Sequence, residues 1–199
     1  MARYIGPKRK LSRREGTALF AKDTPFLERK GALPPGQHGG KRRRKMSEYG
    51  LQLREKQKAK RMFGLMERQF SNYYRACGKH SNKGLALLTA LEMRLDNIAY
   101  RLGFVRSRNG ARQLVSHGHI SVNGKKVNIP SFSVKVGSTV AILGKMLDNT
   151  GVKISLEETK TLPEWLERKA TVGKVLRLPA REEMEPGVNE QMIVEYYSR

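Results

Sequence analysis

The stretch EMRLDNIAYRLGFVRSRNGARQLVSHGHISVNGKKVNI, from Glu92 to Ile129, decides the fold of this chain. Around its start, apolar residues recur at three- and four-residue steps, which predicts one stripe along a continuous helix: Leu88, Leu91, Leu95, Ile98 and Leu102. Gly103 is expected to end this helix. Four polar residues fall outside the stripe: Arg94, Asp96, Asn97 and Arg101. Asp96 stands beside Arg94 and Asn97, so a structural ion pair or a cap-like hydrogen bond is expected there.

A second helix is predicted after this glycine. Ser107 is a suitable N-cap, because its hydroxyl can accept a hydrogen bond from the first turn. The apolar face of this helix would consist of Ala111, Leu114 and Val115. Arg108 and Arg112 stand four residues apart, so they share another face and are expected to project together.

A hairpin is predicted after the second helix, which ends at Gly118. Ile120 and Val122 alternate with polar neighbours, as in a half-buried strand. Asn123-Gly124 favours a type I′ turn, which needs positive φ at both central residues. The cationic edge of this helix–helix–hairpin unit is expected to hold five side chains over a folded polyanion: Arg108, Arg112, His117, His119 and Lys125.

Positive charge dominates the chain except in its last quarter. The 199 residues include 40 Lys and Arg against 18 Asp and Glu, a formal net charge of +22. Residues 1–50 carry 14 basic and 4 acidic side chains, residues 51–145 carry 18 and 4, and residues 146–199 carry 8 and 10. Because like charges repel in a compact protein, this excess predicts a polyanionic partner. We expect a basic working surface and a separate end that faces protein or solvent.

The sequence argues against a membrane protein and against a secreted one. The longest apolar run, from Leu85 to Met93, is far shorter than the roughly twenty residues that span a membrane. The basic N-terminus lacks the apolar core of a signal peptide. A single cysteine, Cys77, excludes an intramolecular disulfide framework and fits a reducing compartment. A cytoplasmic protein is therefore expected.

Residues 1–45 are predicted to be extended, because charge is mixed with proline and glycine without a sustained helical period. Five consecutive cations run from Lys41 to Lys45. A solvated, disordered tail is one interpretation of such a run. Scattered apolar residues favour instead a segment that orders on binding: Tyr4, Ile5, Leu11, Leu19, Phe20, Phe26 and Leu27.

A helical region is predicted from Ser47, because LQLREKQKAKRMF is rich in good helix formers. One face of this helix would present Arg54, Lys58 and Arg61. Beyond Gly64, a second stripe repeats at helical spacing: Met66, Phe70, Tyr73, Tyr74 and Cys77. Its aromatic rings could stack on bases, but core packing is favoured at this spacing, with Arg68 and Arg75 outside the stripe.

The remaining third of the chain is predicted to complete a small sheet and return to the helical region. Alternation predicts further strands at Val134, Val136, Val140 and Ile142. A short helix is predicted to start at Pro163, with Trp165 as a core or interface anchor. A final strand is predicted at Val175, Leu176 and Leu178. Asn189 would cap a terminal helix that packs on the helical region through Met192, Ile193 and Tyr196.

Several parts of the sequence resemble one family. MRLDNIAYRLGF and ARQLVSHGHISVNGKKVNIPS resemble the RNA-binding module named after the bacterial small-subunit ribosomal protein S-four. YGLQLREKQKAKRMFGLMERQF, the opening MARYIGPKRKLSRREG and the ending NEQMIVEYYSR are similar to the rest of that family. The resemblance implies an α+β fold: an extended basic segment (1–45), a mostly helical domain (46–91 with 179–199), and an inserted RNA-binding module of two helices plus a short antiparallel sheet (92–178).

The resemblance also implies a function and partners. Members of the family bind small-subunit ribosomal RNA at a junction of several helices and nucleate assembly of that domain. They lie near the channel through which messenger RNA enters, and they contribute to translational accuracy. Expected partners are therefore ribosomal RNA, messenger RNA and neighbouring small-subunit proteins, with no membrane and no self-oligomer. Arg9 and Ser12 stand where some members carry zinc-binding cysteines, so the chain resembles a cysteine-free, zinc-less variant without cofactor or metal.

An enzyme is not expected. Pseudouridine synthases carry the same module beside a large catalytic domain, and the residues outside the module are too few and too basic for that domain. No phosphate-binding loop motif is present. His117 and His119 lack further ligands for a metal, so they are assigned to phosphate or base edges. A free-standing RNA-handling factor or modifying enzyme that uses the same module remains the alternative.

The predicted RNA-binding residues are cations and polar side chains of all three parts of the chain. Most of their contacts are expected with phosphate and ribose, because the RNA major groove is too narrow for a reading helix. They are Arg3, Lys8, Arg9, Lys10, Arg13, Arg14, Lys41, Arg42, Arg43, Arg44, Lys45, Arg54, Lys58, Arg61, Arg68, Ser107, Arg108, Arg112, Gln113, His117, His119, Asn123 and Lys125.

Overall fold

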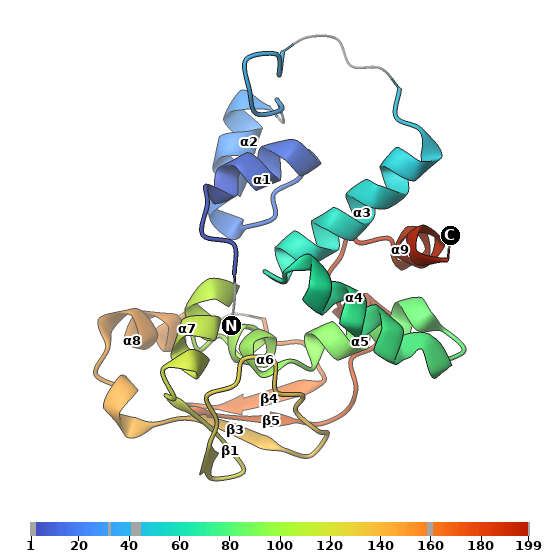
Figure 1. Ribbon diagram of the computed structural model, residues 1–199. Helices are drawn as coiled ribbons and strands as arrows, with labels where there is room; N and C mark the ends of the chain where they lie inside the picture. The colour runs from blue at the N-terminus through green and yellow to red at the C-terminus, as the bar shows by residue number, and fades with distance from the viewer. Residues whose placement is uncertain (1–2, 32, 41–44, 159–160, 199) are drawn as a thin grey trace. The chain divides into compact units, whose positions relative to one another are not determined.

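The computed structural model describes residues 3–31, 33–40, 45–158 and 161–198, without the side chain of Lys145 (Figure 1). The fold class is α+β, as predicted. The chain divides into two compact units, which are residues 1–84 with 187–199 and residues 85–186. The three-part division made from the sequence, with boundaries after residues 45, 91 and 178, remains a prediction.

The first unit is built from helices in its described residues. They are α1 (Lys8–Glu15), α2 (Thr24–Lys30), α3 (Glu48–Met62), α4 (Glu67–Ala76) and α9 (Glu190–Tyr197), with short 3-10 helices η1 (Ala21–Asp23) and η2 (Cys77–Lys79). The N-cap predicted at Asn189 is confirmed, because its side chain accepts a hydrogen bond from the Met192 N–H at 3.3 Å. Ser47, where the helical region was predicted to begin, caps α3 by accepting a hydrogen bond from the Gly50 N–H at 3.3 Å.

The prediction that residues 1–45 are extended is wrong for α1 and α2. Gly16 and Gly31 end these helices with positive φ values of 74° and 66°. The buried hydroxyl of Ser12 donates to Asp23 at 2.6 Å and accepts from the Leu19 N–H at 3.3 Å. Helices this short are only marginally stable by themselves, so tertiary contacts such as these stabilise them. The sequence does not predict them, because no apolar residues repeat there at helical spacing.

The aromatic stripe on α4 packs mainly within the first unit. Phe70 is fully buried and Cys77 is buried, which confirms the prediction of core packing for both. Tyr74 stacks on Tyr197 of α9, with ring centroids 4.5 Å apart. Met66 is 41 % exposed, so the prediction that it belongs to the core is wrong.

The second unit packs helices against a five-stranded antiparallel sheet of order β2-β1-β3-β5-β4 (Figure 1). The strands are β1 (Ile120–Val122), β2 (Lys125–Lys126), β3 (Thr139–Ile142), β4 (Leu166–Lys169) and β5 (Val172–Val175). The helices are α5 (Lys83–Glu92), which begins at the end of the first unit, α6 (Leu95–Arg101), α7 (Arg108–Ser116) and α8 (Thr150–Glu157), with short 3-10 helices η3 (Gly144–Met146) and η4 (Arg181–Glu183). A single hydrophobic core joins α6 and α7 to the sheet.

The hairpin and the second helix of the sequence prediction are confirmed. Asn123 and Gly124 both have positive φ, at 50° and 78°, as a type I′ turn requires. Ala111, Leu114 and Val115 of α7 are buried in the core, as expected from their spacing. The turn therefore fixes the register in which Val122 faces Lys125.

The continuous helix predicted through Leu88 and Leu102 is wrong. The chain leaves the helix between α5 and α6, where Arg94 has an extended backbone (φ −70°, ψ 140°) and pairs with Ser133. The Leu95 N–H donates to the Phe132 carbonyl at 2.9 Å. A stripe of leucines cannot reveal this break, because the leucines on both sides of it face the core.

Later parts of the second unit differ in detail from the prediction. Val140 and Ile142 lie in β3 as expected, whereas Val134 and Val136 lie outside the strands. The segment from Pro163 leads into β4 rather than a helix, although Trp165 is a fully buried core residue as predicted. The final strand is β5, and two residues expected in it lie beyond its end: Leu176 and Leu178. Helix α8 was not predicted, so the two-helix description of the module is incomplete.

Candidate nucleic-acid interface

Helix α7 exposes polar side chains beside a recess in the second unit. Ser107 caps the helix, as predicted, by accepting a hydrogen bond from the Gly110 N–H at 3.1 Å. The recess has a volume of about 340 Å³ and brings together four predicted RNA-binding residues: Ser107, Gln113, His117 and His119. Its apolar lining includes Leu114, Met146 and Val152. Hydrogen-bonding groups beside apolar surface suit the edge and face of an unpaired base.

The β1–β2 hairpin presents two lysines. Lys125 and Lys126 are exposed, and neither contacts a carboxylate in the part of the chain that the structure describes. Of these two, only Lys125 was predicted to bind RNA, although adjacent lysines after Asn123-Gly124 are a signal for both. Asn123 has a structural role, because its side-chain oxygen accepts from the Thr139 N–H at 2.8 Å. The hairpin therefore offers two cations on a rigid turn.

The prediction that Arg112 projects from α7 is wrong. It is only 5 % exposed, and its guanidinium lies 3.6 Å from the Asp96 carboxylate. Arg94, at 1 % exposure, donates to the same carboxylate at 2.7 and 3.0 Å. Two buried guanidinium groups therefore share one buried carboxylate, and this cluster ties the start of α6 to α7. The structural ion pair expected for Asp96 is confirmed in its contact with Arg94, whereas its contact with Arg112 was not predicted.

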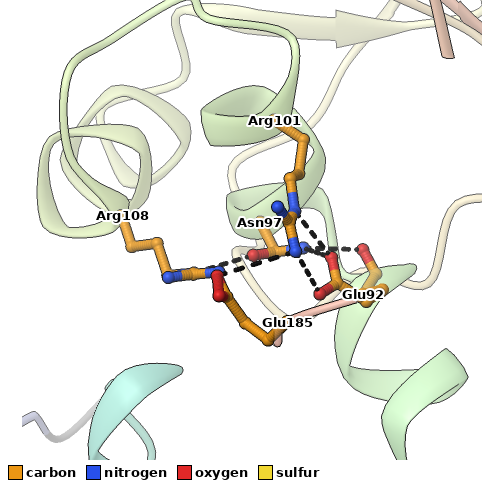
Figure 2. Close-up of polar contacts among 5 residues, drawn as sticks. All are labelled: Glu92, Asn97, Arg101, Arg108 and Glu185. Atoms are coloured by element: carbon orange, nitrogen blue, oxygen red, sulfur yellow. Dashed lines mark hydrogen bonds and ion pairs between the residues drawn. The ribbon is translucent and has the colours of Figure 1, made fainter. Parts of the chain in front are cut away.

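Arg108 is held inside a second network of charged groups (Figure 2). Its Nε donates to Asn97 at 2.9 Å, its guanidinium is in ion-pair contact with Glu185, and its Cζ lies 4.6 Å from the centre of the Tyr100 ring. Only 16 % of its side chain is exposed. Arg108 is therefore a positioned guanidinium at the edge of α7 rather than a mobile surface cation.

The other half of this network is centred on Glu92, whose side chain is 1 % exposed. Arg101 donates to its two carboxylate oxygens at 2.7 and 3.0 Å, and the Asn97 amide donates to it at 2.5 Å (Figure 2). Arg101 also lies 3.6 Å from Glu185. Asn97 thus links the two halves, because its amide donates to Glu92 while its carbonyl accepts from Arg108.

Glu185 should make the stability of the second unit depend on pH. Burial alone would raise the pKa of Glu185, but Arg108 and Arg101 outweigh burial and hold this pKa below its ordinary value. A lowered pKa stabilises the fold above the unfolded value of about 4.3 and loses that contribution as pH falls towards the folded value. We therefore expect Glu185→Gln to lower the free energy of unfolding at pH 7 and to differ progressively less from wild type below about pH 4.

Unfolding in urea, followed by the fluorescence of Trp165, measures this effect, because the single tryptophan lies in the core of the second unit. Glu157→Gln on the exposed face of α8 is the matched control. A difference between Glu185→Gln and wild type that stays constant down to pH 3 would contradict the assigned ion pairs.

In the first unit, the predicted face of α3 is tied to α1 by a buried carboxylate. The Glu15 side chain is 1 % exposed, is in ion-pair contact with Arg61 and lies 3.5 Å from Arg54. Lys58 lies 3.4 Å from Glu55 on its own helix. The three cations expected on one face are therefore present, each beside a carboxylate.

The other predicted cations of the first unit fall into three groups. In the described residues, no carboxylate contacts the exposed side chains of Arg3, Lys10, Arg14, Lys45 and Arg68. The cations of the second group make contacts within the unit. The Lys8 Nζ lies 5.7 Å from the centre of the Phe20 ring, and the Arg9 Cζ lies 4.6 Å from the centre of the Phe26 ring. The Arg13 guanidinium donates to two backbone carbonyls at 2.8 and 3.0 Å. Four predicted residues lie outside the described residues: Lys41, Arg42, Arg43 and Arg44.

In the part of the chain that the structure describes, no three His, Cys, Asp or Glu side chains gather where they could hold a metal ion. No helix of that part has the length and apolar character needed to cross a bilayer. The description of the chain as cysteine-free is wrong, because Cys77 is present, although no cysteine occurs upstream of it. Cys77 is buried, and burial raises the pKa of its thiol, which makes it an unreactive core residue.

Comparisons with known proteins cover the whole chain. The family described as "Ribosomal protein S4/S9 N-terminal domain" matches residues 3–92, and the "S4 domain" matches residues 93–140. Proteins named "Small ribosomal subunit protein uS4" from Dictyoglomus turgidum and Akkermansia muciniphila are 53 % and 50 % identical, with all of this chain and all of each relative covered. A third, from Herpetosiphon aurantiacus, is 49 % identical over the same complete span. The chain therefore belongs to the family of the small ribosomal subunit protein uS4.

Proposed function

We propose that this protein is a structural, non-enzymatic component of the small ribosomal subunit that binds its ribosomal RNA in the cytoplasm. The observation that carries the proposal is the full-length similarity to proteins of that name, at 49–53 % identity. The net charge of +22 and the exposed cations of both units support it, because RNA phosphates would neutralise them.

The second unit supplies two kinds of RNA contact in this proposal. Lys125 and Lys126 on the hairpin engage phosphates, which position the protein without reading sequence. The recess beside α7, with Gln113, His117 and His119, engages an unpaired base or its ribose. Arg108 contributes from a fixed position next to them, while buried Arg112 supports α7 from inside. The RNA-binding module is proposed to span residues 92–178.

The finer parts of the function are proposals from family resemblance. They are nucleation of one RNA domain during assembly, contact with messenger RNA near the channel through which it enters, and a contribution to translational accuracy. Lys45 is exposed at the end of the five-cation run, which supports a contact between that run and a nucleic acid. The mildly acidic last quarter of the chain is proposed to face neighbouring small-subunit proteins.

The hairpin lysines provide the test of RNA binding. We expect Lys125→Ala with Lys126→Ala to weaken binding to small-subunit ribosomal RNA and to reduce the slope of log affinity against log salt by about 1–2, since each lost phosphate contact removes about 0.7–0.9. The measurement is titration of labelled RNA with the full-length protein at several salt concentrations, beside arbitrary RNA of equal length.

The matched control removes two other exposed lysines of the same unit. Lys153 and Lys169 lie 3.7 and 3.1 Å from Asp148 and Glu167, so their replacement by alanine should leave the salt slope nearly unchanged. Equal slopes for both double variants would contradict the placement of phosphates on the hairpin. A wild-type protein without preference for ribosomal RNA would contradict the proposed function and favour a general RNA-handling factor.

A further inference from the structure

A cavity in the first unit has features that the recess on α7 lacks. Its volume is about 410 Å³, within the range of roughly 300–1,000 Å³ that small-molecule sites occupy. It lies among the N-terminal residues, α1, the end of α3 and the start of α4. One part of its lining is apolar and another is cationic.

The apolar part combines a buried floor with two open side chains. Leu11 and Leu65 form the floor, at 8 % and 4 % exposure, while Tyr4 and Met66 are 43 % and 41 % exposed. Gly6 lets the Tyr4 ring fold close to the backbone, because a Cβ at Gly6 would lie 2.6 Å from the tyrosine oxygen and 2.7 Å from its Cζ. An aromatic ring and a thioether are therefore presented at the cavity without covering it.

The cationic part consists of two side chains that are paired with carboxylates and two that contact no carboxylate. Arg61 is in ion-pair contact with Glu15, and Lys60 lies 2.8 Å from Glu67. Lys10 and Arg14 follow each other at one-turn spacing on α1, both exposed, and no carboxylate of the described chain contacts either. The cavity therefore has positive charge available at its α1 side.

We propose that this cavity takes one unstacked nucleotide of the bound RNA. Its base would lie against Tyr4 and Met66, and its flanking phosphates would lie at Lys10 and Arg14. This inference rests on the proposed function, since it concerns the same RNA. A nucleotide has the required combination of an aromatic face, which stacks on tyrosine, and adjacent negative charge. An acidic peptide would neutralise the lysine and arginine but would leave the apolar lining uncovered.

The test uses the full-length protein and small-subunit ribosomal RNA, with affinity, salt slope and chemical modification of the bases as readouts. Tyr4→Ala should weaken binding about tenfold with an unchanged salt slope, because a stacked base is lost and no phosphate contact is. Tyr4→Phe keeps the ring and should bind like wild type. Ile5→Ala is the matched control, since this neighbour is 87 % exposed and does not line the cavity.

Base modification locates the nucleotide. One base should be protected by the wild type, Tyr4→Phe and Ile5→Ala, and should become reactive with Tyr4→Ala. Met66→Ala, on α4, should expose the same base, which separates loss of the cavity from a disturbed N-terminus. The inference would be overturned if Tyr4→Ala bound RNA with wild-type affinity and still protected this base. A reduced salt slope in Tyr4→Ala would also overturn it, because that result would mean that only phosphate is bound. If wild type itself lacks preference for ribosomal RNA, both this inference and the proposed function fail.

Discussion

Replacing Asp96 with alanine is expected to lower the free energy of unfolding of the second unit by about 3–5 kcal/mol, the usual cost of removing one partner from a buried ion pair. Asp96 is 5 % exposed, and it is the shared counter-charge of Arg94 and Arg112, which are 1 % and 5 % exposed. In the variant, two buried guanidinium groups would lose the carboxylate that they share. Burying such charges is costly because protein atoms solvate them poorly compared with water.

Urea unfolding followed by Trp165 fluorescence measures this loss in the unit that contains the cluster. Asp148→Ala is the matched control, because that side chain is 92 % exposed and lies 3.7 Å from Lys153, so its removal should change stability by less than about 1 kcal/mol. Similar midpoints for the two variants would show that the Asp96 cluster contributes no more than a surface ion pair.

Features that depend on neighbouring residues could be predicted from the sequence. The predicted caps at Ser107 and Asn189 act within three residues, and the turn at Asn123-Gly124 follows from the backbone freedom of those two residue types. Four residues predicted to bind RNA also lie together at one recess: Ser107, Gln113, His117 and His119. A helix face and the turn after it are near in sequence as well as in space.

Features that depend on distant partners could not be predicted. Arg108 pairs with Glu185, 77 residues later, and nothing in the local sequence indicates that this arginine is engaged. Arg112 was expected to project, because the sequence pattern records polarity and not whether a counter-charge such as Asp96 lies beneath the side chain. The number of basic residues in a sequence therefore overstates the number of cations available to RNA. The structure distinguishes the cations that contact carboxylates from those that do not.

Glu92→Gln is expected to lower the free energy of unfolding of the second unit by about 3–5 kcal/mol as well. Glu92 is 1 % exposed, and its charge balances Arg101, which is 18 % exposed in its side chain. Glutamine keeps the shape and one acceptor oxygen, but it replaces the other oxygen with an amide that faces the donating groups of Arg101 and Asn97. The loss therefore combines a guanidinium that keeps only the more distant Glu185, at 3.6 Å, with opposed donors in a buried site.

The same substitution should also weaken RNA binding under conditions where the variant remains folded. Asn97 connects Glu92 to Arg108, so a turned Asn97 amide would release the guanidinium from its position at the edge of α7. Glu157→Gln controls for the charge change on an exposed site of the same unit. Trp165 fluorescence gives the stability, and RNA titration in buffer without urea gives the affinity. Reduced stability with wild-type RNA affinity would mean that the network supports the fold alone, and that Arg108 reaches the RNA without being positioned by it.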